Sequence, residues 1–495
     1  MFVQSRKISP WKTSDYVRTI FLFVLHTIII AGIYIATIYL NDPSQASFVE
    51  YFKNTSTRKD FLYLVVETTI LVGIMYLYFI FENRNAIKIA SNVNLIFVIV
   101  EISLLMSYIV GKYVGIYARP FALCAILTLM LVDRTSAITV NTVLCIMVFI
   151  MDTFTNINFV GTSDKAIFSS LILGFTCGVL GIYLVNQVLE RAKLFLLGSC
   201  ISIPAFICVL ILEVIPHSAN SIWLIALSIF SGILSIVFVM IFLPLLEYIF
   251  NVDTDFRLAE LTDSNAKLIK RLRLQAPGTY QHCIVVSTLA QACAIAIGEK
   301  AIMARAAAYY HDMGKLKNPE FFAENQMGEN PHAGLTPELS VDIIRSHTTD
   351  GYDLIQRNNL PQFLADVALQ HHGTLPIRYF YAKALKFTDN EVDIRNYSYQ
   401  GPKPQTKIAA IIMICDASEA KIRSMNDRSG EKVDRAVREI IEERMELDQF
   451  SECDITLREI EIIRNAIVEN IAGIYHDRVK YPKIKIRKTD IEGKE

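Results

Sequence analysis

Histidines and aspartates that suit metal binding recur along the second half of the sequence. The central run is Tyr309-Tyr310-His311-Asp312-Met313-Gly314-Lys315, which places an imidazole beside a carboxylate and a lysine shortly after them. Around it stand His282, His347, His371, His372 and Asp416. Adjacent residues of a helix point about 100° apart, so His311 and Asp312 can approach one metal from two sides while Asp312 reaches a second. A lone His-Asp pair is common by chance, but this ordered set is not.

The order H…HD…H…HH…D is the metal-binding pattern of the HD-domain phosphohydrolases, and shorter runs narrow the resemblance. They are Ala276-Pro277-Gly278-Thr279-Tyr280, the run from His311 to Lys315, Phe322-Ala323-Glu324-Asn325-Gln326, His371-His372-Gly373-Thr374 and Gly401-Pro402-Lys403-Pro404. Together they resemble the membrane-bound 7TM-HD (PgpH-like) cyclic-di-AMP phosphodiesterases of bacteria. The resemblance covers about residues 255–485 at the level of motifs, and the membrane half is similar in architecture.

The resemblance implies a ligand set for two divalent transition metal ions. His282, His311, Asp312 and Asp416 would hold one ion, and Asp312 would bridge to a second, held by His347, His371 and His372. Imidazole and carboxylate ligands suit Fe, Mn or Zn, with Fe or Mn expected here. Two such ions can activate a shared water and clamp phosphoryl oxygens during in-line attack.

The implied function is a metal-dependent phosphodiesterase that linearises cyclic di-AMP to pApA and so lowers this second messenger. Asp312 and Lys315 are the expected catalytic residues, and Lys315 would neutralise charge that develops on the scissile phosphate. A bare lysine is more often a surface residue, so only its place after His311-Asp312 supports this role.

Other functions remain open at this stage. An HD-GYP-type domain would hydrolyse cyclic di-GMP, but the Gly373-Thr374-Leu375-Pro376 run lacks the signature of that group. Other nucleotides or alarmones are weaker alternatives. From a different class, the chain could be a catalytically silent nucleotide receptor, or a transporter or channel regulated by its nucleotide domain. The complete ligand set favours an enzyme, and the apolar spans predict few of the paired charges or broken helices of transporters.

Composition divides the chain into a membrane half and a soluble half. The 495 residues are 53% hydrophobic, and the apolar excess lies in residues 18–250, whereas residues 251–495 carry most of the charge. The net charge of −1 offers no basic field for a nucleic-acid polymer. Nine cysteines without a CxxC pair predict unpaired thiols.

The sequence predicts an all-α fold with about eight membrane spans before an all-helical HD domain. We expect a transmembrane domain over 1–250, a helical connector over 251–275 and a cytosolic HD domain over 276–495. The first apolar run is longer than a signal peptide requires, which favours a retained helix. The expected spans are residues 17–40, 61–81, 92–111, 118–133, 138–160, 166–187, 195–215 and 221–250.

The placement of lysine and arginine predicts that both ends of the membrane half face the cytosol of a bacterial cell. In this arrangement Arg119 falls in an outer connection. Relatives typically carry a large extracellular domain after the first helix, but only Asn41 to Asp60 fill that place here. The expected partners are the lipid bilayer and a cyclic dinucleotide, and a homodimer is among the assemblies that the resemblance allows.

Several single residues receive structural interpretations. Glu67, Glu101 and Asp152 lie at membrane depth, where we expect protonated carboxyls hydrogen-bonded inside the bundle. The connector run Thr262-Asp263-Ser264 predicts a helix N-cap. His332 is expected to cap a loop, with substrate contact as the alternative. His476-Asp477 is expected to be structural or to lie on the surface. The segment Tyr379 to Pro404 either flanks the substrate or forms a surface excursion.

Overall fold

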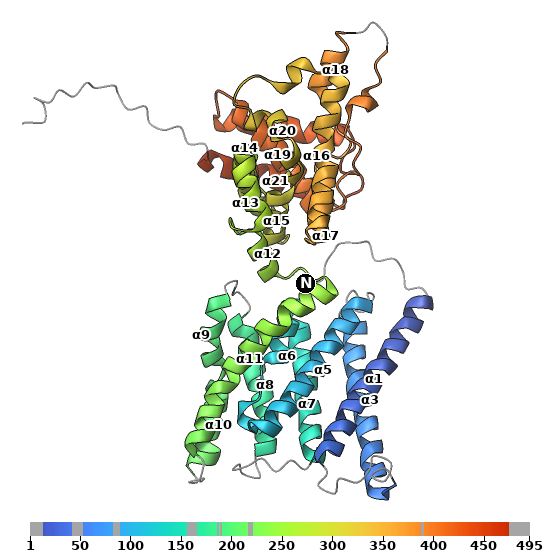
Figure 1. Cartoon of the computed structure of the whole chain (residues 1–495), viewed down its shortest axis with the longest axis vertical. Helices are drawn as coiled ribbons and strands as arrows, with labels where there is room; N and C mark the ends of the chain where they lie inside the picture. The colour runs from blue at the N-terminus through green and yellow to red at the C-terminus, as the bar shows by residue number, and fades with distance from the viewer. Residues whose placement is uncertain are drawn as a thin grey trace, which may run out of the picture. The chain divides into compact units, whose positions relative to one another are not determined.

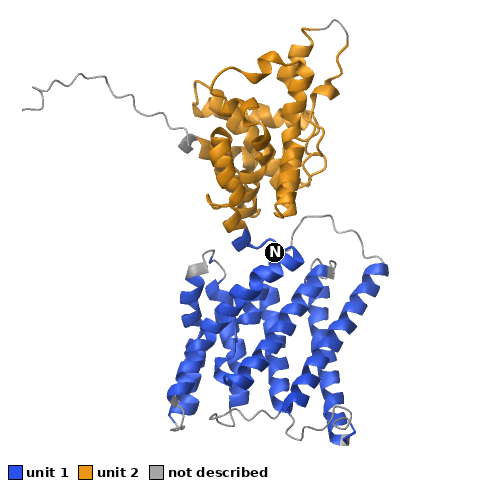
Figure 2. Cartoon of the chain, viewed as in Figure 1, with its two compact units in different colours: residues 1–257 blue, residues 258–495 orange. Residues whose placement is uncertain are grey.

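The computed structural model describes residues 13–41, 53–82, 90–155, 166–185, 188, 191–215, 221–387 and 391–474. The chain forms two compact units, Met1–Arg257 (the first unit) and Leu258–Glu495 (the second unit). Figure 2 shows the two units in different colours. The boundary between them falls within the segment for which the sequence predicts a connector, residues 251–275. The described residues are helical, with one isolated bridge between Pro376 and Ser398, so the all-α class is confirmed.

Among the described residues of the first unit, seven helices are long and apolar enough to cross a membrane (Figure 1). Because their side chains are apolar around much of the circumference, they can face both lipid and one another. They are α1 (Thr13–Asn41), α3 (Thr55–Glu82), α5 (Ala90–Tyr113), α7 (Arg134–Thr155), α8 (Ala166–Val185), the combined segment of α9 (Arg191–Ile201), α10 (Ile203–Val209) and the π-helical turn η2 (Leu210–Val214), and α11 (Ser221–Phe250).

The remaining predicted span, residues 118–133 and the fourth along the chain, is not one continuous helix. A single 3-10 turn, η1 (Ile116–Ala118), leads into it, and its second part is a nine-residue helix, α6 (Leu123–Leu131). Gly115 has a φ of 146°, and Arg119 is extended as the residue before Pro120, so the helix cannot continue through this segment. Residues 116–128 are all buried. Other helices therefore surround the irregular backbone, which is the condition for such backbone at membrane depth.

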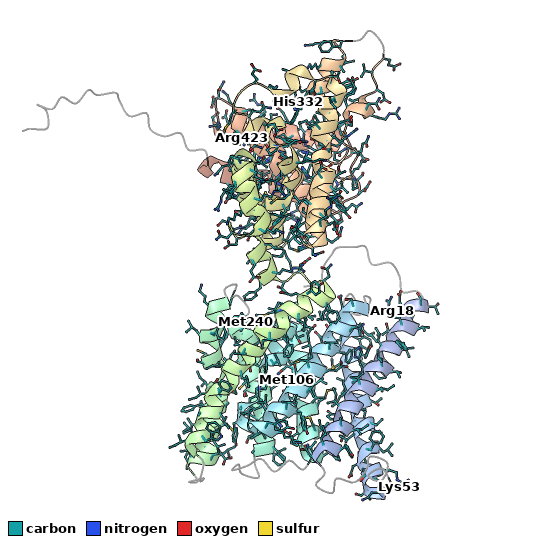
Figure 3. The ribbon with its side chains drawn as sticks, in the orientation of Figure 1. Arg18, Lys53, Met106, Met240, His332 and Arg423 are labelled. Carbon is teal, nitrogen blue, oxygen red and sulfur yellow. The ribbon has the colours of Figure 1, made fainter. Side chains whose placement is uncertain are left out.

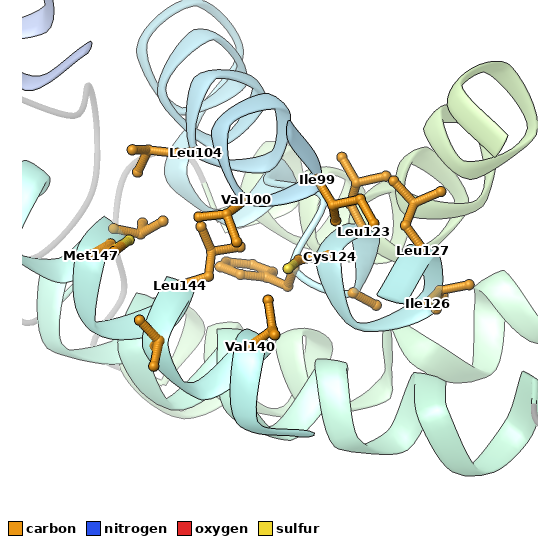
Figure 4. Packing of buried hydrophobic residues seen from close by; sticks show 14 of the residues in the cluster. Ile99, Val100, Leu104, Leu123, Cys124, Ile126, Leu127, Val140, Leu144 and Met147 are labelled. Carbon is orange, nitrogen blue, oxygen red and sulfur yellow. The ribbon is translucent and has the colours of Figure 1, made fainter. Parts of the chain in front are cut away.

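Apolar side chains from α5, α6 and α7 fill the centre of the first unit (Figure 4). Ile99 and Val100 come from α5, Cys124 from α6, and Val140 and Leu144 from α7. Each is less than a tenth exposed. The short helix α6 is therefore a central packing element of this unit.

The broken span carries a buried ion pair, and this corrects two sequence predictions. Arg119, expected in an outer connection, is 0% exposed, and its two terminal nitrogens donate to the Asp152 carboxylate at 2.5 and 2.6 Å. Ser170 donates to the same carboxylate at 3.2 Å. Asp152 is thus paired with a cation, whereas the sequence predicted a protonated carboxyl. The first unit thus contains a paired charge and a broken helix, features of which the apolar spans predicted few. Two side chains far apart in the sequence form this contact.

The other two carboxylates that the sequence placed at membrane depth, Glu67 and Glu101, differ from Asp152. Glu101 on α5 faces His26 on α1, whose Nδ1 lies 2.8 Å from a carboxylate oxygen. The His26 ring also stacks on Phe97 at 4.5 Å. Glu67 on α3 is half-buried. The Glu101 contact agrees with the predicted hydrogen bonding inside the bundle, and it ties the first helix to α5.

The second unit is a bundle of helices that begins with two short ones. The predicted N-cap at Thr262-Asp263-Ser264 was wrong, because the residue before α13 is Ala266. Asp263 instead accepts a hydrogen bond from the Asn265 backbone within the turn.

The helices of the second unit are α12 (Asp255–Leu261, which starts before the unit boundary), α13 (Lys267–Gln275), α14 (Pro277–Ile297), α15 (Ala301–Tyr310), α16 (Pro337–Arg357), α17 (Gln362–Gln370), α18 (Arg378–Ala384), α19 (Lys407–Ser424), α20 (Gly430–Glu446) and α21 (Leu457–Ile474).

The core of the second unit is built around α14 and α19. Their buried faces are small or branched, with Cys283, Ala290 and Ala294 on α14 and Ile411 and Ile414 on α19. Small side chains let helices approach closely, so polar residues on neighbouring turns come together. Helix α14 is apolar enough to resemble a membrane span by composition, yet it belongs to this unit.

Candidate metal centre

Five helices of the second unit bring the seven predicted ligands together. His282 projects from α14, His311 and Asp312 follow the end of α15, and His347 lies on α16. The remaining residues are His371 and His372, directly after α17, and Asp416 on α19. His311, Asp312, His347 and His371 are each at most 2% exposed. Polar donors of this kind are rarely buried together without a common partner.

The His311-Asp312 turn is held in place by a close backbone approach. Helix α15 ends at Tyr310, His311 keeps helical dihedrals, and the chain then enters the 3-10 helix η3 (Met313–Lys317). A Cβ on Gly314 would stand 1.9 Å from the His347 carbonyl oxygen. Only glycine lets this turn touch α16, so the glycine of the motif sets the distance between Asp312 and His347.

Asp312 lies between two groups of ligands, and its two oxygens face opposite sides. Its Oδ2 is 3.3 Å from His311 Nε2 and 3.7 Å from His282 Nε2. Its Oδ1 is 3.5 Å from His347 Nε2 and 3.8 Å from His371 Nε2. A carboxylate that presents one oxygen to each of two ligand groups can bridge two ions.

The donors on either side of Asp312 form two sets, each within 4.8 Å of one another. One comprises His282, His311 and Asp416, which we call the His282 half, and the other comprises His347, His371 and His372, the His347 half. Asp416 also reaches toward the other set, with Oδ2 3.8 Å from His372 Nδ1. Imidazole and carboxylate donors in this arrangement fit divalent transition metals.

Backbone carbonyls fix which ring nitrogen faces the cluster in three of the histidines. The Nδ1–H groups of His311, His347 and His371 donate to the carbonyl oxygens of Ala308, Ile344 and Ala368, at 2.7, 2.5 and 2.8 Å. Nε2 of each ring is then the lone-pair nitrogen, pointing into the cluster. His311 Nε2 and Asp312 Oδ1 are buried without a hydrogen-bond partner among the described residues. Donors left in this state suit a metal ion.

The electrostatics differ between the two halves. Burial lowers the pKa of His282, but hydrogen bonds to Asp416 and Glu419 outweigh burial and raise its pKa to about 9. Burial lowers the pKa of His372 to about 3 and also lowers the pKa values of His347 and His371. Burial alone would raise the pKa of Asp312, yet Lys315 and the nearby histidines hold it well below its usual range.

Lys315 faces the cluster and is held by two carboxylates. Its Nζ lies 2.7 Å from Asp312 Oδ2 and 2.9 Å from Glu324 Oε1. Burial lowers the pKa of Lys315, but Asp312 and Glu324 raise it well above its ordinary value. Lys315 is therefore a fixed cation beside the carboxylate that lies between the two halves.

Two of the motif-like runs, Ala276 to Tyr280 and Phe322 to Gln326, contact each other directly. Asn325 Oδ1 accepts hydrogen bonds from the backbone of Gly278 and Thr279, at 2.9 and 3.1 Å. Thr279 donates through its hydroxyl to Glu324 Oε1 at 3.0 Å. The run from Ala276 to Tyr280 thus holds the run from Phe322 to Gln326, which in turn positions the Glu324 carboxylate against Lys315.

Two contributors to the centre were not predicted from the sequence. Glu419 on α19 contacts His282, and its spacing of three residues from Asp416 is the signal that would have indicated it. Tyr399 stacks on the His372 ring at 4.3 Å, so part of the segment from Tyr379 to Pro404 lies against the cluster.

Two other histidines were predicted to lie outside the cluster. His332 lies in the short 3-10 helix η6 (Pro331–Gly334), where its Nε2 is 3.0 Å from the Phe321 carbonyl oxygen. This contact fits the predicted structural role. His476-Asp477 lies outside the described residues.

Comparisons with known proteins match both units of the chain. Residues 59–254 match the family model described as "7TM receptor with intracellular HD hydrolase", and residues 279–421 match the model for the HD domain. These matches define the class: a multi-pass membrane protein joined to an HD domain. Both matches agree with the resemblance to the 7TM-HD family that the motifs predicted. An HD domain binds divalent metal, which agrees with the clustered histidines and aspartates.

Two curated relatives have PgpH names. The chain is 41% identical over 313 residues to the "Cyclic-di-AMP phosphodiesterase PgpH" of Listeria monocytogenes serotype 1/2a (strain 10403S), covering 62% of this chain and 44% of that protein. It is 35% identical over 408 residues to the protein of the same name from Bacillus subtilis (strain 168), covering 81% and 56%. The chain thus spans about half the length of these relatives.

A solved structure also matches. The crystal structure of the L. monocytogenes PgpH HD domain in complex with cyclic di-AMP is 48% identical and covers 43% of this chain and 99% of that chain, with a TM-score of 0.41.

Proposed function

We propose that the protein is a membrane-anchored phosphodiesterase that uses two metal ions to hydrolyse cyclic di-AMP to pApA. The observation that supports this most directly is the position of Asp312, with one oxygen toward each set of ligands. The names of the two curated relatives support the substrate. Residues 1–250 would serve as the membrane domain, 251–275 as the connector and 276–495 as the HD domain.

Each predicted ligand has a place in this proposal. His282, His311 and Asp416 would hold one ion, His347, His371 and His372 the other, and Asp312 would contact both. When bound, two Fe or Mn ions would supply an activated water and charge stabilisation for an in-line phosphoryl transfer. The backbone carbonyls behind His311, His347 and His371 hold each Nδ1–H and aim Nε2 inward, so these rings need no reorientation to bind.

Lys315 is the proposed electrostatic catalyst. Glu324 holds its ammonium beside the cluster, so a phosphate oxygen that gains charge during hydrolysis meets a cation already in place. Such preorganisation costs no rearrangement at the moment of reaction. Tyr399 would restrict the His372 ring from the opposite side through the stacked contact.

The proposed location is the bacterial cell membrane, with the N-terminus and the HD domain in the cytosol. The matched family description, which names an intracellular HD hydrolase, supports this orientation. Cytosolic placement would give the site access to a second messenger made inside the cell.

Turnover by the full chain in detergent tests the function. Protein loaded with Mn or Fe would be incubated separately with cyclic di-AMP and cyclic di-GMP, beside a His311→Gln variant. We expect cyclic di-AMP to be converted to pApA by the wild type alone. Binding of cyclic di-AMP without cleavage, in protein that carries two metal ions, would instead establish a silent receptor. Faster cleavage of cyclic di-GMP than of cyclic di-AMP would overturn the assignment of cyclic di-AMP as the substrate.

A further inference from the structure

We propose that Glu419 is a positioning residue for His282 and that it makes the two halves of the centre unequal in metal affinity. The His282 half would hold its ion more tightly, and the His347 half would release its ion first. This inference rests on the proposed two-ion function and adds to it a residue that lies behind the ligands.

The contact between Glu419 and His282 is short and buried. Oε2 of Glu419 lies 2.5 Å from Nδ1 of His282, and the Glu419 side chain is 1% exposed. The other nitrogen of the ring, Nε2, faces Asp416 Oδ1 at 3.0 Å. A carboxylate that accepts from Nδ1–H fixes the tautomer and orientation of the ring. It also makes the lone pair of Nε2 more basic, and therefore a stronger metal ligand.

Helix α19 supplies both carboxylates to this one ring. Asp416 and Glu419 are three residues apart, so they share a face of the helix that packs against α14. Arg423, one turn further on and labelled in Figure 3, lies 3.5 Å from Glu419 Oε1. The arginine therefore holds the oxygen that His282 does not use, which fixes the carboxylate from both sides.

In the other half of the centre, the ring nitrogens of His347 and His371 that face away from the cluster have no carboxylate partner among the described residues. Nδ1 of His347 and of His371 each meets a neutral backbone carbonyl. The His347 half supplies three imidazoles and shares Asp312, whereas the His282 half adds Asp416 as a ligand and Glu419 behind the ring. The carboxylates of Asp416 and Glu419 favour retention of a divalent cation, and burial strengthens their effect. Two cations lie on the same side, Lys315 at 2.7 Å from Asp312 Oδ2 and Arg423 at 3.5 Å from Glu419 Oε1, but only the carboxylates contact the His282 ring.

A purely structural role for Glu419 is the competing explanation. In that case the carboxylate would satisfy a buried ring N–H and support packing, and its loss would lower stability without selecting one metal site. The two explanations separate when the charge is removed while the size of the side chain and its hydrogen-bond acceptor are kept. Glu419→Gln makes this change.

Stepwise release of Mn from the full chain in detergent tests the inference. Wild type, Glu419→Gln and a control, Glu439→Gln, would be equilibrated with chelators of increasing strength, and bound Mn counted per chain. Electron paramagnetic resonance would distinguish paired from single Mn ions. Glu439 loses the same charge on the exposed face of α20, where it pairs with Lys421. Thermal melting of metal-free protein would report folding.

We expect two release steps in the wild type, with a single Mn left after the first. Glu419→Gln should weaken the later step by about tenfold or more, which is the usual size of such an effect, and leave the earlier step unchanged. His371→Gln, which damages the His347 half, should retain only the later step, and adding Glu419→Gln should weaken that step equally. Glu439→Gln should match the wild type.

The contrary outcomes are equally distinct. Two wild-type steps of equal affinity, or a Glu419→Gln effect that is absent or confined to the earlier step, would overturn this inference and leave the proposed enzyme intact. Fewer than two Mn ions per wild-type chain would overturn the two-ion function and this inference together.

Discussion

The first unit satisfies its buried charge with an opposite protein charge, whereas the second unit directs buried donors toward one another. Arg119 and Asp152 meet through two hydrogen bonds and are both fully buried. In the metal cluster, Asp312 Oδ1 and His311 Nε2 lack hydrogen-bond partners among the described residues. The first arrangement suits a structural contact, and the second suits binding of a cation. Substitutions should therefore affect folding in one unit and chemistry in the other.

Asp312→Asn should produce the largest effect, and that effect should be on metal binding and catalytic activity. The amide presents one weak oxygen ligand and one N–H group, so a single residue can no longer serve both halves. We expect bound metal to fall from two ions to at most one. Activity should fall by about a thousandfold or more, since metal charge stabilisation contributes several kcal/mol. Metal analysis and pApA formation would measure these changes.

The control for this variant is Asp350→Asn, which changes a carboxylate on α16 that pairs with the exposed Lys317. It should retain two ions and full activity. A metal content of two ions in Asp312→Asn would show that Asp312 does not bridge the two halves.

Arg119→Met should produce the next largest effect and should act on folding. It leaves the Asp152 carboxylate buried without its cation, a change that costs about 3–5 kcal/mol in comparable buried pairs. We expect a lower melting temperature and less monodisperse protein in detergent. The double variant Arg119→Met, Asp152→Leu should recover most of the loss, because an apolar pair replaces a charged one.

The matched control is Arg18→Met, whose pair with Asp15 is 40% exposed at the arginine and should contribute little. Normal stability of Arg119→Met, together with loss of turnover, would mean that the charge pair of the first unit acts in function.

Lys315→Met should reduce activity by about a hundredfold and leave metal content at two ions. The ammonium stabilises developing charge and is not a ligand, so its loss should lower kcat with little change in bound metal. Lys317→Met removes a lysine two positions away that is 62% exposed and should behave as wild type. Loss of one ion from Lys315→Met would indicate that the lysine organises the ligands instead.

The sequence was informative about the cluster because rare ligand types stand in a local order. His311-Asp312 and His371-His372 are adjacent pairs at helix ends, and their place in the chain carries most of the information. Glu419 was missed because a glutamate near Lys421 and Arg423, at the charged end of a helix, resembles a solvated residue. Only the packing of α19 against α14 shows that it is buried.

The first unit was harder to predict for a related reason. Arg119 stands between two apolar runs, so the sequence suggested a connection, and its partner Asp152 is 33 residues away. The apolar residues of 118–133 indicated a span, but Gly115 and Pro120 interrupt the helix. Hydrophobicity shows which residues avoid water. Tertiary packing then decides whether those residues face lipid or other parts of the protein.

Protons released when metal ions bind should give the smallest of these effects. They also compare the two halves of the metal centre directly. In metal-free protein the pKa of His282 is raised to about 9, so at pH 7.5 this ring is protonated and must lose a proton to become a ligand. The pKa values of His347, His371 and His372 are lowered, so these rings are already neutral. Asp312 and Asp416, with pKa values held low, are already ionised.

Calorimetric titration in buffers of different ionisation enthalpy would count these protons. We expect the ion that enters the His282 half to release about one proton, and the ion that enters the His347 half to release almost none. Affinity of the His282 half should therefore rise with pH up to about 9 and then level off, whereas the affinity of the other half should already be constant at pH 7.5. Equal release from both halves would mean that the carboxylates around His282 do not distinguish it from the other rings.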